Sequence, residues 1–102
     1  MKAAWVVATA VLAATALFGS YDAALEDERI DTVLVATPPD SHLELTLRAL
    51  DHGRNVIVEK PAFPGVSDFA AVRAAAARSG RRVLVAENYA YKPVTLLLGR
   101  LL

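Results

Sequence analysis

Three short apolar runs, each followed at once by polar residues, constrain the fold of this chain more than any other feature. They occupy residues 33–36, 55–58 and 83–86 and contain almost only Val, Leu, Ile and Ala. Runs of this length and composition are typical of strands buried on both faces of a parallel sheet. An open parallel sheet binds its ligand outside the carboxyl ends of its strands. The sequence therefore predicts one site at one edge of one sheet.

The segments between the runs predict helices. Ser41 and Glu44 have the spacing of a capping box at a helix N-terminus, and Gly53 stands where a helix end needs a left-handed residue. After the second run, Ser67 is the predicted N-cap of another helix, which Gly80 ends. The predicted buried faces carry Leu43, Leu47 and Leu50 in the first helix and Phe69, Val72 and Ala76 in the second.

The order of these elements predicts the fold class. A short polar helix over residues 21–27 precedes the first strand, and Pro93 opens a last helical segment over residues 94–102. Strands that alternate with helices through short loops predict parallel strands joined by right-handed crossovers. We therefore expect an α/β fold: a partial, doubly wound parallel sheet with a β-α-β-α-β core, helices on both faces and an apolar, helical N-terminal segment.

The N-terminal run leaves two alternatives open. Residues 3–18 carry no charge, but a membrane-spanning helix needs about 20 apolar residues. Lys2 and the tripeptide Ala14-Thr15-Ala16 fit a signal peptide with a minimal basic region and an A-x-A cleavage site. We favour a buried helix or strand of the fold, because the basic region is one residue. The expected location is the cytoplasm, with export as the alternative if residues 1–16 are a signal peptide.

Composition excludes several kinds of site. Eleven basic residues balance eleven acidic ones, so no net field favours nucleic acid or an anionic membrane surface. The chain has no cysteine, and its only histidines, His42 and His52, lack the spacing of metal ligands on one helix face. We therefore expect no metal ion, nucleic acid or membrane among its partners.

The residues after the first run are candidate site residues, each with a plainer alternative. Thr37, Pro38 and Pro39 place a hydroxyl and a rigid turn before helix amides that can face an anion. They can equally form an ordinary turn between strand and helix. His42 falls in the first turn of the predicted helix, where it either contacts a ligand or bonds a loop carbonyl.

The residues after the second and third runs add further candidates. Lys60 precedes Pro61, which favours an extended backbone at the lysine and permits a cis peptide bond. Its ammonium group can act on a substrate, or it can be an ordinary loop lysine paired with Glu59 or with solvent. Asn88, after the third run, either donates hydrogen bonds into the same cleft or packs at the end of the sheet.

The runs and their polar ends belong to three longer motifs. These are Asp31-x-Val33-x-Val35-Ala36-Thr37-Pro38-Pro39-x-x-His42, then Ala49-Leu50-x-x-Gly53-x-x-Val56-x-x-Glu59-Lys60-Pro61, and finally Ala86-Glu87-Asn88-Tyr89 with Tyr91-Lys92-Pro93. Together, from about residue 18 to residue 93, they resemble the Gfo/Idh/MocA family of NAD(P)-dependent oxidoreductases. Three motifs at the right mutual spacing make this a specific resemblance.

The resemblance implies a Rossmann-like fold and a redox activity. In this family, hydride passes between a carbon of a sugar or polyol and the nicotinamide ring of NAD or NADP. It implies that Lys60 orients the substrate hydroxyl and assists its proton transfer. The residues it implies at the nicotinamide side of the cofactor are Thr37, Pro38, Pro39, His42, Glu59 and Asn88. The protein contributes positioning and electrostatics, because the cofactor carries the hydride.

The sequence also departs from the family pattern. It lacks the G-x-G-x-x-G turn that lets a pyrophosphate approach the backbone, since Gly19 is the only glycine before Gly53. We expect an apolar, unassigned segment or remnant helix over residues 1–19, a partial NAD(P)-binding domain over residues 20–92, and over residues 93–102 the start of a truncated helix leading to a second domain.

A partial domain of this kind has an open edge. The strand over residues 33–36 would expose an apolar edge, through which copies of the chain can pair. The alternative function is therefore a non-catalytic half-domain that pairs with a partner chain, exported or tethered to a membrane by its N-terminal run.

Overall fold

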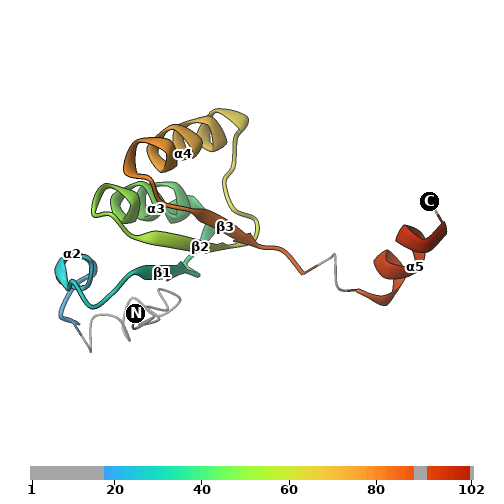
Figure 1. The fold of residues 1–102 in the computed structure, drawn as a ribbon, viewed down its shortest axis with the longest axis horizontal. Helices are drawn as coiled ribbons and strands as arrows, with labels where there is room; N and C mark the ends of the chain where they lie inside the picture. Colours follow the sequence, from blue (N-terminus) through green and yellow to red (C-terminus); the bar gives the residue numbers. More distant parts are fainter. Residues whose placement is uncertain (1–17, 89–91, 102) are drawn as a thin grey trace.

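A three-stranded parallel sheet organises the part of the chain that the structure describes (Figure 1). The structure is a computed structural model that describes residues 18–88 and 92–101. Strands β1 (Thr32–Val35), β2 (Asn55–Glu59) and β3 (Val83–Ala86) lie in the order β1-β2-β3. All three predicted strands are confirmed, each within one residue of its expected bounds. The prediction of a helical N-terminal segment lies outside the described residues.

The helices occupy the segments between and beside the strands. They are α2 (Tyr21–Glu26), α3 (His42–Asp51), α4 (Val66–Ser79) and α5 (Pro93–Leu101), with a single 3-10 turn, η1 (Pro39–Ser41), before α3. Helix α3 packs on β1 and β2, and α4 packs on α3, so both lie on the same side of the sheet (Figure 1). The predicted β-α-β-α-β order is confirmed. None of the helices in the described ranges is both long and apolar enough to cross a membrane.

The core lies between α3 and one face of the sheet. Val33, Val35, Val56 and Val58 point to this face and are almost completely buried. Leu50 and its neighbours on α3 cover them. The opposite face carries Leu34, Ile57 and Leu84, of which the first two are half-buried and Leu84 is 63% exposed. Within the described residues, the expectation of burial on both faces is thus met on one face only.

Ser41 occupies the predicted N-cap position of α3 but does not form the predicted capping box, and the prediction of Ser67 as an N-cap was wrong. Ser41 lies inside the η1 turn with a helical backbone, and its side chain makes no capping bond to α3. The turn that Pro39 begins continues directly into α3, so Ser41 lacks the extended backbone that a capping side chain adopts. Helix α4 begins one residue before Ser67, with Gly65 as its N-cap. The Asp68 carboxylate accepts a hydrogen bond from the Gly65 amide at 2.9 Å.

The predicted helix ends were correct. Gly53 and Gly80 have φ angles of 72° and 67°, a left-handed conformation that glycine adopts without strain. The predicted buried face of α4 was correct in part, because Val72 is buried but Phe69 is 43% exposed. The Phe69 ring instead packs edge-on against Phe63, with 5.0 Å between ring centroids.

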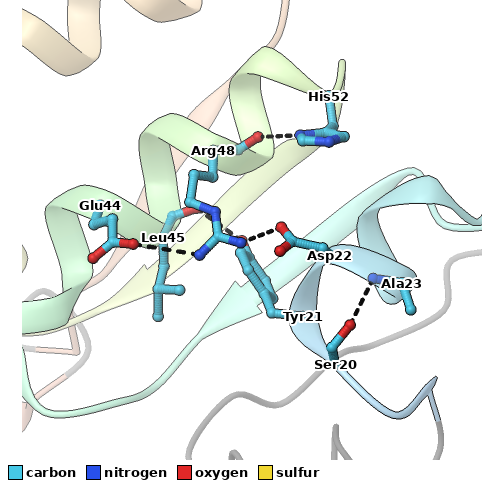
Figure 2. Close-up of polar contacts among 8 residues, drawn as sticks. All are labelled: Ser20, Tyr21, Asp22, Ala23, Glu44, Leu45, Arg48 and His52. Atoms are coloured by element: carbon cyan, nitrogen blue, oxygen red, sulfur yellow. Dashed lines mark hydrogen bonds and ion pairs between the residues drawn. The ribbon is translucent and has the colours of Figure 1, made fainter.

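A polar cluster joins α2 to α3 (Figure 2). The Tyr21 hydroxyl donates a hydrogen bond to the Leu45 carbonyl oxygen at 2.8 Å. The Arg48 guanidinium lies 5.2 Å from the centroid of the Tyr21 ring and pairs with both Asp22 and Glu44. Burial raises the pKa of Tyr21 well above its usual range. These contacts hold α2 against α3 through polar groups as well as through the core.

Candidate active site

An open cleft of about 510 Å³ lies at the carboxyl ends of β2 and β3. This is the edge of the sheet where the sequence placed the site, because parallel strands bring their carboxyl ends to one edge. Among the residues described, the cleft is lined by Glu59, Lys60, Leu84, Val85, Ala86, Glu87 and Asn88. Three of the predicted site residues, Glu59, Lys60 and Asn88, are thus brought together.

Lys60 directly follows β2 and lines this cleft. Its Nζ donates a hydrogen bond to Asn88 Oδ1 at 2.7 Å, and its backbone N–H donates to Glu59 Oε2 at 2.8 Å. The Lys60-Pro61 peptide bond is cis. The pairing of Glu59 with Ala86 in the sheet explains why Lys60 and Asn88 meet, because each follows shortly after one member of that pair. The ammonium group is therefore held at one point in the cleft by a residue from the neighbouring strand end.

The loop after β1 is built by hydrogen bonds among its own residues. The Ser41 hydroxyl lies 2.6 Å from Thr37 Oγ1 and 2.7 Å from the Pro38 carbonyl oxygen. Thr37 is buried, whereas Pro38 and Pro39 are exposed. This loop contributes none of the lining residues given above.

His42 connects this loop to the segment after β2. Its Nε2 lies 2.7 Å from the Thr37 carbonyl oxygen, and its Nδ1 lies 2.9 Å from the Ala62 carbonyl oxygen and 3.1 Å from that of Pro61. Of the two alternatives raised by the sequence, the structure shows the bond to loop carbonyls. Contact of Thr37, Pro38, Pro39 and His42 with a cofactor stays a prediction.

Some residues of the site were not selected from the sequence. Glu87 lines the cleft between Ala86 and Asn88, and its place directly after an apolar run was the signal that could have selected it. Ser41 bonds Thr37 instead of capping a helix, and no local pattern distinguishes these two roles. In the described ranges, no group of three or more His, Cys, Asp or Glu residues could hold a metal ion.

The fold and the position of the cleft define a class of protein. An open parallel sheet with a cleft outside the carboxyl ends of its strands is the arrangement of dinucleotide-binding α/β domains. A family model described as the oxidoreductase family with an NAD-binding Rossmann fold, GFO_IDH_MocA, matches residues 2–87. The chain belongs to this family. The match begins nearer the N-terminus than the motifs noted above, which start near residue 18.

Individual relatives agree with the family. The chain is 37% identical over 81 residues to "Oxidoreductase P35" of Formosa agariphila, covering 79% of this chain and 25% of that protein. It is 32% identical over 78 residues to "D-xylose 1-dehydrogenase (NADP(+)) 2" of Haloferax volcanii, covering 76% of this chain and 24% of that protein. The chain therefore spans about a quarter of the length of these curated relatives.

A solved structure shows the same fold. The crystal structure of an NAD-binding protein from Listeria innocua superimposes with a TM-score of 0.79 at 36% sequence identity, over 87% of this chain and 28% of the other. The predicted Rossmann-like fold class is thus confirmed.

Proposed function

We propose that this chain supplies the nicotinamide side of the active site of an oxidoreductase that transfers hydride between NAD or NADP and the hydroxyl-bearing carbon of a sugar or polyol. The observation that carries this proposal is the Lys60 ammonium group, held by Asn88 in a cleft at the carboxyl edge of a parallel sheet. An ammonium group fixed in such a cleft can bind a substrate oxygen and exchange a proton with it.

Lys60 has the chemistry that the reaction needs at the substrate oxygen. As an ammonium group, Nζ donates a hydrogen bond to a substrate carbonyl oxygen and gives it a proton as the carbonyl becomes an alcohol. In the reverse direction, the neutral amine takes the proton of the hydroxyl. Asn88 accepts a hydrogen bond from the ammonium group. The side chain of Asn88 thus orients Lys60.

The described residues fit one end of a nicotinamide cofactor. When bound, the cofactor would accept or supply the hydride. The cleft has the volume of an ordinary small-molecule site, and its walls combine the apolar Leu84 and Val85 with the polar Glu59 and Asn88. Apolar walls can pack against a ring, and Asn88 and Glu59 can bond polar substituents. The sequence contains no G-x-G-x-x-G turn, so this fit concerns the nicotinamide end.

Similar proteins support the substrate class. The Haloferax volcanii relative is named a D-xylose 1-dehydrogenase that uses NADP(+), and the solved relative from Listeria innocua is named NAD-binding. We infer that the substrate carries a sugar-like or polyol-like hydroxyl and that the cofactor is NAD or NADP.

We also infer that the protein acts in the cytoplasm, which contains the soluble nicotinamide cofactors. Cell fractionation combined with N-terminal sequencing tests this inference. An intact Met1 in the cytoplasmic fraction supports it, and a chain cut after Ala16 in an exported fraction refutes it.

Titration of the purified chain with NADH and with NADPH tests the proposed function directly. Isothermal calorimetry should show saturable binding of one cofactor. Oxidation of aldoses and polyols, followed by the absorbance of the reduced cofactor, should then reveal turnover. Lys60→Ala should lower kcat by about 10² to 10⁴, the usual contribution of a general acid or base, with little change in the affinity for the cofactor.

Arg78→Ala is the matched control, because it also removes one cation but from the last turn of α4, away from the cleft lining. It should leave binding and kcat unchanged. Failure to bind either cofactor, or a kcat for Lys60→Ala close to that of the unaltered chain, would refute the proposed function.

A further inference from the structure

The hydrogen bonds of His42 link the loop after β1 to the segment after β2, which the pairing of these strands does not join. Its side chain is only 1% exposed, and both ring nitrogens face backbone carbonyl oxygens. Nε2 faces Thr37 at the end of β1, while Nδ1 faces Pro61 and Ala62 after β2. The sheet pairing of these two strands ends at Val35 and Val58. Beyond that point, the imidazole ring bridges the two chain segments.

In the hydrogen bonds of this bridge, the imidazole ring must be the donor. Carbonyl oxygens only accept hydrogen bonds, so every proton on the ring nitrogens of His42 points at a backbone carbonyl. A neutral ring donates on one side only, and a doubly protonated ring donates on both. In either state, the N–H groups of the ring are directed at the loops rather than at the cleft, and only the doubly protonated ring donates to both loops.

The other histidine provides a contrast within the same helix region. His52, the residue after α3, is exposed, and its Nδ1 lies 2.8 Å from the carbonyl oxygen of Arg48 in the last turn of that helix. It links nothing outside α3. The bridge is therefore a property of the position of His42 at the first residue of α3, between the two strand ends.

We propose that His42 is a positioning residue that clamps the loop after β1 to the segment after β2 and thereby fixes Lys60 at the mouth of the cleft. Pro61 directly follows Lys60, so a ring that holds the Pro61 and Ala62 carbonyls limits where the lysine backbone can lie. The importance of Lys60 rests on the proposed function, whereas the clamp itself can be tested without any cofactor.

Two substitutions separate the two halves of the clamp. In His42→Asn, the side-chain amide can take the place of Nδ1 and donate to the Pro61 or Ala62 carbonyl. In His42→Gln, the longer side chain can take the place of Nε2 and donate to the Thr37 carbonyl. His52→Gln is the matched control, because it changes the same residue type at an exposed position of the chain.

Carbon-detected carbonyl–nitrogen NMR spectra of the full chain measure the result, since they report the Thr37 carbonyl even though Pro38 has no amide proton. His42→Gln should shift the Pro61 and Ala62 carbonyl signals and the backbone amide of Lys60, and leave Thr37 in place. His42→Asn should shift Thr37 and preserve the Lys60 amide. His52→Gln should leave all of these signals unchanged.

Equal shifts on both sides of the ring in the two variants, or no shift in either, would overturn the clamp. The unaltered chain provides a second measurement that does not depend on the folding of a variant. At least one ring N–H of His42 should exchange with water far more slowly than that of His52, and equal rates would overturn the proposal. An intact clamp in a chain that binds no cofactor would refute the proposed function alone.

Discussion

Replacement of Tyr21 by Phe tests whether the buried phenol makes the free energy of unfolding depend on pH in the alkaline range. The Tyr21 hydroxyl donates to the Leu45 carbonyl oxygen, and burial raises its pKa well above the usual range (Figure 2). Desolvation is the largest cause, and Asp22 adds to it, while Arg48 acts in the opposite direction. The folded chain therefore keeps the phenol protonated at pH values where the unfolded chain loses that proton.

The size of the effect follows from the proton balance. At neutral pH the phenol is protonated in both states, so Tyr21→Phe removes only the hydrogen bond, worth about 0.5 to 1.5 kcal/mol. A tyrosine in the unfolded chain titrates near pH 10. Above that value the unfolded state of the unaltered chain gains stability by ionising, at about 1.4 kcal/mol per pH unit until the folded pKa is reached. The stability advantage of Tyr21 should therefore shrink above pH 10 and disappear near pH 11.

Urea unfolding of both chains between pH 7 and pH 11 measures this difference. The unaltered chain should be the more stable one at pH 7, and the free energies of unfolding of the two chains should converge as the pH rises above 10. A difference that stays constant from pH 7 to pH 11 would contradict the burial of the phenol, because ionisation would then be equally easy in both states.

Four other substitutions test the core, two glycines and an exposed ion pair. Leu50→Ala should lower the free energy of unfolding by about 2 to 5 kcal/mol, because the side chain is fully buried; a loss below about 1 kcal/mol would contradict this packing. Gly80→Ala should destabilise the chain by about 1 to 2 kcal/mol through backbone strain alone, since φ is 67° and no atom lies within 4 Å of the added Cβ. Gly99→Ala, inside α5, should instead favour its helix by about 0.5 to 1 kcal/mol, and the same sign for both glycines in thermal unfolding would refute the assignment. Hydrogen bonds from the side chain and backbone amide of Arg29 lower the pKa of Asp27 to about 2. The stability that this provides is present above the unfolded pKa near 3.9 and is lost as the pH falls towards 2, so Asp27→Asn should flatten the acid unfolding profile between pH 4 and pH 2. An unchanged profile would contradict the pairing.

The strands and the helix ends could be predicted because their signals are local. A short uninterrupted apolar run favours a strand of a parallel sheet, and the left-handed backbone at Gly53 and Gly80 is a property of glycine itself. The same reasoning placed Lys60 and Asn88 at one edge of the sheet, since parallel strands end on the same side. The structure adds the 2.7 Å bond between them.

The details that escaped prediction depend on partners distant in the sequence. Every residue has a carbonyl group, so nothing in the sequence could show that His42 bonds those of Pro61 and Ala62. Ser41 matched a capping pattern, but its hydroxyl bonds Thr37 instead, because the turn that Pro39 begins continues into the helix. The helical spacing placed Phe69 on the predicted buried face of α4, but the side chain is 43% exposed.

The order of strand pairing has a consequence for synthesis on the ribosome. Each strand pairs with the next one along the chain, β1 with β2 and β2 with β3, so the β1-α3-β2 unit can assemble while β3 is still being translated. At about 5 to 20 residues per second, β3 follows β2 by roughly one to five seconds. During that interval the loop of Lys60 and the ring of His42 can already come together, whereas Asn88 does not yet exist. The cleft is therefore completed only after β3 and Asn88 have been synthesised.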